Sequence, residues 1–262
     1  MKELTVIKVG GKVIDDPEAL KRFLDSFVEV SGAKILVHGG GKIASDFGNR
    51  LGITPQLING RRITDKPTLE LVTMVYGGLV NKNIVAQLQE RGENAIGLTG
   101  ADANVISANK RQVSAIDYGY VGDVSRTDVN TAMISNFIDA GLVPVLCPLT
   151  HDGNGNLLNT NADTIASVLA TAMTEKFRVN LIYCFEQDGV LEDFAKNKVI
   201  ATITYDQYDK LKTEGVIQAG MIPKMDNAFD AIKGGVDTVK IGSFQSVQTL
   251  VKGKSGTKIT LS

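Results

Sequence analysis

Short runs of apolar, often β-branched residues alternate along the chain with longer stretches whose apolar positions recur at helical spacing. The runs predict buried strands at residues 4–9, 34–37, 95–98, 143–147, 180–184 and 238–241. The stretches predict amphipathic helices at residues 17–30, 42–51, 66–89, 131–140, 163–173, 205–214 and 224–233. This alternation is typical of βαβ units. We therefore predict an α/β fold, a three-layer αβα sandwich with a central, mainly parallel sheet.

Two segments depart from the alternation. Residues 105–126 have no helical period and contain the turn signals Asn109-Lys110 and Tyr118-Gly119, which predict hairpins that form a flap over the sheet edge. Residues 149–156 contain a cluster of turn-forming residues, after which strand-like residues resume at once. We therefore expect one domain with a continuous sheet, whose N-terminal lobe covers about residues 1–150 and whose C-terminal lobe covers about residues 151–262.

Composition narrows the class of protein. Hydrophobic residues make up 43% and charged residues 22% of the chain, as in ordinary globular domains. With 28 Lys and Arg against 29 Asp and Glu, there is no electrostatic reason to expect a nucleic-acid partner. The longest apolar stretch, residues 141–149, is too short for a membrane helix. The N-terminus lacks the apolar core of a signal peptide, and Cys147 and Cys184 lie in apolar runs. We expect buried thiols in a reducing cytoplasm.

Glycine-rich loops follow three of the predicted strands. They are Gly10-Gly11 before Lys12, Gly39-Gly40-Gly41 before Lys42, and Gly189 after the strand that ends near Cys184. Any one of them could be a tight turn. Two such runs on consecutive strands of one sheet, however, indicate backbone amides turned toward an anion. The loops do not match a P-loop, and the loose dinucleotide-binding spacing in the second loop lacks the acidic residue that would hold a ribose.

Basic side chains lie beside these loops. Lys8 ends its strand two residues before the first glycine pair, so its ammonium can reach the same anion. Arg62 could bind a carboxylate with its planar guanidinium, although a solvated loop arginine is the simpler interpretation. Lys224 stands at a helix start, where a cation opposes the helix dipole. That position is a mild indication of function.

A third group is polar and precedes a predicted helix. Asn161 is a plausible N-cap, and Asp163 suits the positive end of the helix dipole in the first turn. Helix formation therefore explains two of the three polar residues here. It does not explain Asn159.

Five motifs together make the chain resemble the amino acid kinase family, and within it the acylglutamate branch, over essentially its whole length. They are IKVGG at 7–11, VHGGG at 37–41, NGRRIT at 59–64, NTNAD at 159–163 and GMIPK at 220–224. The first and last occur broadly in this family, whereas the other three are more specific to the acylglutamate branch. The resemblance implies a helix-covered parallel sheet, with the acylated amino acid held in the N-terminal lobe and ATP in the C-terminal lobe.

The resemblance also implies a reaction and a set of roles. The reaction is ATP-dependent phosphorylation of the γ-carboxylate of N-acetyl-L-glutamate in arginine biosynthesis, with Mg²⁺ carried chiefly by the ATP phosphates and water and no metal-ligating residue expected. The implied catalytic residues are Lys8, Lys224 and Asp163. The implied substrate-binding residues are Gly40, Gly41, Arg62 and Asn159. The implied phosphate- and ATP-binding residues are Gly10, Gly11, Glu186, Asp188, Gly189 and Gly220.

Three alternatives stay open at this point. Where the family usually has Ser/Thr-Asp-Val-x-Gly, residues 185–189 read Phe-Glu-Gln-Asp-Gly, so either Glu186 or Asp188 could contact the nucleotide. The acyl group could be larger, such as the succinyl group of N-succinyl-L-glutamate, with its extra carboxylate held by Lys110, Arg111 or Arg126. A non-catalytic binding or regulatory module is also possible, although the intact lysines argue against it.

Assembly is the last expectation. Residues 66–89 carry apolar side chains at near-helical spacing, namely Leu69, Val72, Val75, Leu79 and Leu88. Such a stripe packs either on the core of its own chain or on a helix of a partner chain. The family resemblance favours a two-fold dimer through this helix. Arginine-inhibited members carry an extra N-terminal helix that links dimers into a hexameric ring, whereas here the first strand begins by Leu4. We expect a homodimer that is insensitive to arginine.

Overall fold

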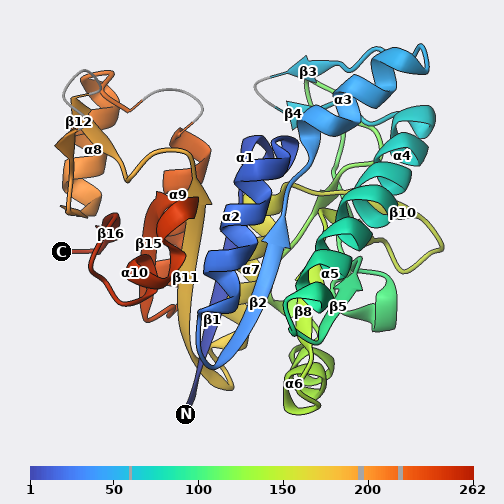
Figure 1. The fold of residues 1–262 in the computed structure, drawn as a ribbon. Helices are drawn as coiled ribbons and strands as arrows, with labels where there is room; N and C mark the ends of the chain where they lie inside the picture. The colour runs from blue at the N-terminus through green and yellow to red at the C-terminus, as the bar shows by residue number, and fades with distance from the viewer. Residues whose placement is uncertain (59–60, 194–197, 218–220) are drawn as a thin grey trace.

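The computed structural model describes residues 1–58, 61–193, 198–217 and 221–262. Its centre is an eight-stranded sheet in the order β14-β16-β15-β11-β1-β2-β8-β5 (Figure 1). These strands are β1 Lys2–Val9, β2 Ala33–His38, β5 Ala95–Leu98, β8 Val143–Leu146, β11 Phe177–Phe185, β14 Thr202–Ile203, β15 Thr238–Ser243 and β16 Thr257–Ile259. All neighbours pair in parallel except β15 and β16, which are antiparallel. The predicted fold class is confirmed.

Each of the six predicted strands is present. β1 lies at the centre, paired along its whole length with β11, from Lys2 opposite Phe177 to Val9 opposite Cys184. Strands β14 and β16 were not predicted, because segments of two and three residues carry too little pattern to be recognised. Since β1 and β11 pair directly, the sheet runs without interruption through both predicted lobes.

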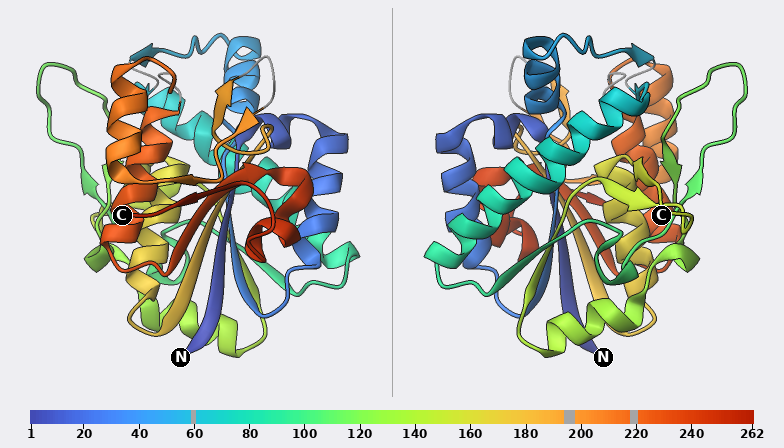
Figure 2. Two further views of the ribbon diagram at one scale, coloured as in Figure 1. Left: turned by 90° about the vertical axis from the view of Figure 1, so that its left-hand side faces the viewer. Right: turned by 90° about the vertical axis from the view of Figure 1, so that its right-hand side faces the viewer.

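Helices cover both faces of the sheet (Figure 2). Alternate residues of β1 pack on opposite faces: Leu4 and Val6 join the core formed with α7 and α9, whereas Ile7 and Val9 join the core formed with α2, α4 and α5. The helices run over α1 Gly11–Asp15, α2 Pro17–Val28, α3 Gly41–Arg50, α4 Lys66–Val72, α5 Asn81–Glu90, α6 Thr131–Asp139, α7 Ala162–Met173, α8 Tyr205–Thr213, α9 Ile222–Lys233 and α10 Val247–Val251. The same alternation turns Lys8 toward α7.

The long helix predicted at residues 66–89 is not one continuous α-helix. Between α4 and α5 lies the π-helix η1, Thr73–Val80. Gly77 and Gly78 fall inside it, and glycine weakens the preference for regular α-helix. Of the five apolar residues that the helical spacing singled out, four pack into the core, whereas Leu79 is substantially exposed, as is Met74 in the same π-helix.

The predicted flap is a hairpin of β6 Asn109–Lys110 and β7 Gly122–Asp123, and residues 111–121 between them extend away from the body (green in Figure 2). The turn expected at Asn109-Lys110 is wrong, because these residues pair as a strand. The remaining short elements are β3 Leu57–Ile58, β4 Arg61–Arg62, β9 Leu149–His151, β10 Leu157–Asn159, β12 Leu191–Asp193, β13 Lys198–Val199 and the 3₁₀ helices Asp102–Asn104, Arg126–Asp128 and Phe244–Ser246.

Cys147 and Cys184 are buried and free, as predicted. Within the described residues, no helix is long and apolar enough to cross a membrane.

Candidate active site

The first two glycine loops meet backbone to backbone at the carboxyl ends of β1, β2 and β11, which point to the same end of the sheet (Figure 1). The Gly10 amide donates to the Cys184 carbonyl over 3.1 Å, and the Gly39 amide donates to the Val9 carbonyl over 3.3 Å. A Cβ atom on Gly11 would lie 3.9 Å from the amide nitrogens of both Gly40 and Gly41. Amide groups from two loops therefore converge here, as the anion-site prediction requires.

A buried histidine supports the second loop from below. His38 is fully buried, and burial lowers its pKa to about 4, so the ring is neutral at pH 7. Its Nδ1–H donates to the Gly39 carbonyl over 2.7 Å, and its Nε2 accepts from the Asn81 side-chain amide over 3.1 Å. The Asn81 amide also donates to the Val145 carbonyl. This chain of hydrogen bonds ties the glycine loop to the sheet and to the start of α5.

Two lysines and one aspartate form a buried cluster on the α7 face of β1. The Lys8 Nζ lies 2.8 Å and the Lys224 Nζ 3.3 Å from the same Asp163 oxygen, Oδ1. The lysine side chains are only 8% and 11% exposed. Three distant segments are brought together: the end of β1, the first turn of α7 and the first turn of α9. Asn161 caps α7 by accepting from the Asp163 and Thr164 amides, as predicted.

The electrostatics of the cluster favour a charged carboxylate at Asp163. Burial by itself would raise the pKa of Asp163, but the charges of Lys8 and Lys224 and their hydrogen bonds outweigh burial and hold this pKa below its ordinary value. Burial, together with repulsion from Lys8, lowers the pKa of Lys224. One carboxylate thus holds two ammonium groups with a net positive charge, which is an environment that attracts an anion.

Tyr183 fixes the geometry of this cluster from below. The strand register places Tyr183 opposite Lys8, and its hydroxyl donates to the Asp163 backbone carbonyl over 3.1 Å. The Lys224 ammonium lies 5.3 Å from the centre of the Tyr183 ring, within the range of a cation–π interaction.

Arg62 reaches the second glycine loop. Its Nη2 donates to the Gly41 carbonyl over 2.9 Å and to the Ser45 hydroxyl over 2.8 Å. Its Nη1 is buried and has no hydrogen-bond partner. A buried guanidinium nitrogen without a partner carries a desolvation cost that an anionic ligand would remove. Residues 59 and 60 of the same motif lie outside the described residues.

Asn159 belongs to the same region. Its side-chain amide donates to the Thr64 hydroxyl over 3.0 Å, and that hydroxyl donates to the Arg62 carbonyl. Asn159 also forms a bridge with Val121, at the base of the flap hairpin. The four predicted substrate-binding residues therefore come from one continuous region around Gly41 and Thr64.

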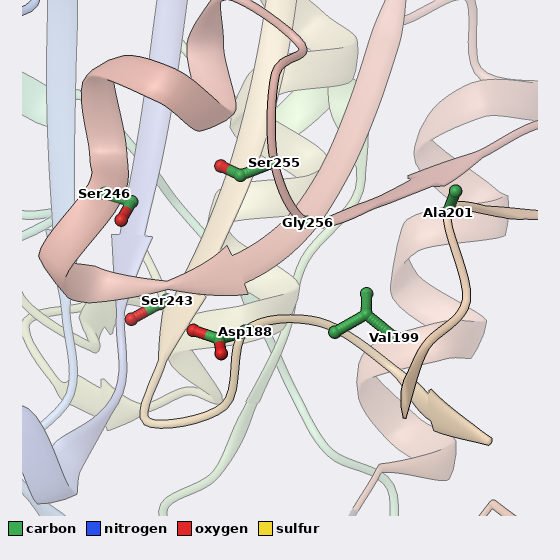
Figure 3. A pocket seen from close by; sticks show the side chains of 7 residues that line it. All are labelled: Asp188, Val199, Ala201, Ser243, Ser246, Ser255 and Gly256. Carbon is green, nitrogen blue, oxygen red and sulfur yellow. The ribbon is translucent and has the colours of Figure 1, made fainter. Parts of the chain in front are cut away.

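The candidates for nucleotide contact divide between two pockets. Glu186 and Gly189 line a pocket of about 280 Å³ beside Lys12, and its apolar wall is formed by Val190, Leu191, Val216, Ile217 and Met221. Asp188 instead lines a separate pocket of about 340 Å³ with Ser243, Ser246 and Ser255 (Figure 3). Of these two pockets, only the one with Glu186 is lined by Lys12, the residue that follows Gly10 and Gly11. Gly220 lies outside the described residues.

Sequence reasoning did not identify three residues at this end of the sheet. Tyr183 was hidden in an apolar strand, and Lys12 was noted only as a lysine beside glycines. Tyr76 lay inside a stretch predicted to be helical, and the pair Gly77-Gly78 directly after it was the one local sign of an irregular helix. Each acquires a place in the site only through tertiary contacts.

Comparison with known proteins places the chain among close relatives. The profile of the Amino acid kinase family matches residues 3–243. The acetylglutamate kinase of Cytophaga hutchinsonii is 54% identical over 263 residues, covering 99% of both chains. The acetylglutamate kinase of Bacteroides fragilis is 54% identical over 251 residues, covering 95% of both. Among solved structures, smu.665 from Streptococcus mutans is 30% identical, with a TM-score of 0.80 and complete coverage of both chains.

Proposed function

Because the chain belongs to the amino acid kinase family, we propose that it is a kinase. It transfers the γ-phosphoryl group of ATP to the γ-carboxylate of N-acetyl-L-glutamate, as the geometry of its site also supports. The product is N-acetyl-L-glutamyl 5-phosphate, an intermediate for arginine biosynthesis. Relatives called acetylglutamate kinase, 54% identical along nearly the whole chain, support this activity.

The observation that carries the proposal is the buried cluster of Lys8, Asp163 and Lys224. A γ-carboxylate is ionised at pH 7, so it can attack phosphorus without a general base. One carboxylate oxygen forms the new P–O bond while the bond from phosphorus to the β–γ bridging oxygen breaks, leaving ADP. The two ammonium groups neutralise charge on the transferring group and on the leaving oxygen. Asp163 orients the lysines and takes no proton in this scheme.

For the substrate, we propose that the N-terminal lobe holds N-acetyl-L-glutamate. The unpartnered Nη1 of Arg62 would pair with the α-carboxylate, and Asn159 would contribute a further polar contact. The amides at Gly40 and Gly41 would face the γ-carboxylate and the phosphoryl group. Asn159 falls numerically in the C-terminal lobe but packs on Thr64, so the two lobes share this site.

For the nucleotide, we propose the pocket beside Lys12 in the C-terminal lobe. Its apolar wall suits a purine, and because Glu186 lines this pocket whereas Asp188 lines the other, Glu186 would be the acidic residue that contacts the nucleotide. Gly10, Gly11 and Gly189 would supply close backbone approach to the ribose and phosphates. Mg²⁺ would accompany ATP, neutralising its phosphates, and the lysine ammonium groups complement the remaining charge.

The test is direct detection of the acyl phosphate. Purified protein, ATP, Mg²⁺ and N-acetyl-L-glutamate should yield an acyl phosphate that hydroxylamine traps as a hydroxamate, in step with ADP release. ADP release without hydroxamate, or no turnover at all, would contradict the proposal and would leave the binding-module alternative.

The acyl group is tested by comparing kcat/KM for N-acetyl- and N-succinyl-L-glutamate. Arg126 pairs with Glu175, and Arg111 pairs with Asp123 but leaves its buried Nη1 without a hydrogen-bond partner. The Lys110 ammonium lies over the Tyr120 ring. Much of the basic charge in this hairpin is therefore already engaged, and the relatives called acetylglutamate kinase favour the acetyl group. We expect the acetyl compound to be the better substrate. A higher kcat/KM for the succinyl compound would reassign the acyl group while leaving the phosphoryl-transfer chemistry unchanged.

Replacing Arg62 with lysine should raise KM for the acylglutamate about tenfold and leave KM for ATP within about twofold. An ammonium cannot reproduce the several donors of the guanidinium, and one charged hydrogen bond corresponds to about this factor. Initial-rate kinetics with each substrate varied in turn provide the measurement. A rise confined to KM for ATP would place Arg62 in the nucleotide site instead.

We further propose a cytoplasmic homodimer that associates through η1 and its flanking helices. Met74 and Leu79 are apolar, 59% and 42% exposed, and lie on the same π-helix. Replacing both with glutamate should halve the mass measured by light scattering, because burial of two charges in an apolar interface is unfavourable. The double variant Val113→Glu/Leu261→Glu, at exposed apolar residues elsewhere, is the control and should remain dimeric. A monomeric wild-type protein would refute the proposal.

A further inference from the structure

Tyr76 stands in an unusual backbone conformation beside the substrate end of the site. It lies near the middle of the π-helix η1, Thr73–Val80, and π-helical turns are rare and concentrate at functional sites. Tyr76 is only 4% exposed. The residues that follow the π-helix serve the same glycine loop, because Asn81 holds His38 and His38 holds Gly39.

The ring of Tyr76 packs against Gly40. A Cβ atom on Gly40 would lie 3.2 Å from Cδ1 and 3.4 Å from Cε1 of the ring, and Gly40 has φ of +150°. The positive φ favours glycine at this position, and a side chain there would press on the ring. The tyrosine ring therefore packs directly on the Gly40 backbone, whose amide belongs to the converging loops described above.

The hydroxyl of Tyr76 and the guanidinium of Arg62 meet at Gly41. The hydroxyl oxygen lies 4.0 Å from where a Cβ of Gly41 would be, and Arg62 Nη2 donates to the Gly41 carbonyl. Both side chains therefore adjoin the Gly41 backbone, and the Arg62 charge opposes the rise in the pKa of Tyr76 that burial causes. A phenol can accept a hydrogen bond from a guanidinium and donate one to an anion at the same time.

From these contacts we infer that Tyr76 is a positioning residue for the acylglutamate: its ring sets the Gly40–Gly41 backbone and its hydroxyl orients the free Nη1 face of Arg62 toward the substrate carboxylate. The inference rests on the proposed function. It assigns Tyr76 to substrate affinity, separate from the lysine cluster that carries the chemistry.

Tyr76→Phe tests the hydroxyl alone. We expect KM for N-acetyl-L-glutamate to rise about three- to tenfold, the range for loss of one hydrogen bond, with kcat and KM for ATP within twofold of wild type. Tyr208→Phe is the matched control, because Tyr208 is equally buried but donates to the Ile222 carbonyl and to Asp226, both on α9; its KM for N-acetyl-L-glutamate should stay unchanged. An unchanged KM for acylglutamate in Tyr76→Phe, or equal rises in both KM values, would overturn the inference.

A double-mutant cycle tests the link to Arg62. The effects of Tyr76→Phe and Arg62→Lys on KM for acylglutamate should combine to less than their product, because both act on one guanidinium. Multiplicative effects would show that the hydroxyl does not act through Arg62 and would overturn that assignment.

Calorimetric titration of wild type and variants with N-acetyl-L-glutamate, without ATP, distinguishes failure of the proposed function from failure of the role of Tyr76. Wild-type binding without turnover would refute the proposed function, whereas an unchanged dissociation constant in Tyr76→Phe would refute the role of Tyr76.

Discussion

Alanine at position 8 or 224 is expected to lower kcat by about 10²- to 10³-fold, the typical loss for one donor that stabilises transition-state charge. Both ammonium groups lie within 3.3 Å of one carboxylate oxygen in a buried cluster at the end of β1. In such a water-poor site the electrostatic interaction of each lysine is stronger than it would be in water. Steady-state kinetics on Lys8→Ala and Lys224→Ala, with both substrates saturating, give the measurement.

The loss should appear in kcat more than in either KM. Charge on the bridging oxygen grows as the phosphorus–oxygen bond breaks, so the ammonium groups interact more strongly with the transition state than with bound ATP. Lys240→Ala is the matched control, because Lys240 is also buried but donates to the carbonyl of Val251, the last residue of α10. That variant should lose stability and keep its turnover number. Turnover near the wild-type rate in Lys8→Ala or Lys224→Ala would disprove the assignment of these lysines.

The parts of the site that could be predicted are those that depend only on local features, namely glycine loops after strands and the alternation of side chains along a strand. A glycine pair directly after a buried strand predicts a loop at the carboxyl end of the sheet, and the two-residue period of a strand places Lys8 on the opposite face from Val9. For Asp163, the helix-capping pattern located the first turn of α7. That this turn faces Lys8 depends on how α7 packs across the sheet, which no local pattern contains.

The parts that could not be predicted depend on packing between distant segments. Glu186 and Asp188 are two residues apart and chemically alike, and only the path of the loop directs them into different pockets. The π-helix that carries Tyr76 could not be predicted, since an apolar stripe over 66–89 is equally compatible with regular α-helix. Four of the five apolar residues in that stripe serve the core, and exposure of Leu79 beside Met74 appears only in three dimensions.

Removing the charge of Asp163 should impair both turnover and folding. Asp163→Asn keeps the size of the side chain but leaves Lys8 and Lys224 facing each other in a buried site without a counter-ion. Breaking a buried ion pair on one side costs about 3–5 kcal/mol, and we expect the free energy of unfolding to fall by roughly this amount. Because one lysine must lose its proton or move away, kcat should fall by at least about 10²-fold, as for loss of one lysine.

The pH dependence separates this charge effect from a simple packing defect. The pKa of Asp163 in the folded protein lies below its ordinary value of 3.8, so the carboxylate stabilises the fold fully above the ordinary pKa and loses that contribution as pH falls through the lowered value. The difference in unfolding free energy between wild type and Asp163→Asn should therefore be constant near neutral pH and shrink below about pH 3.8. Chemical denaturation at several pH values measures it. A difference that stays the same down to the most acidic pH at which both proteins fold would mean that Asp163 acts through its shape, and the electrostatic account of the lysine cluster would then be wrong.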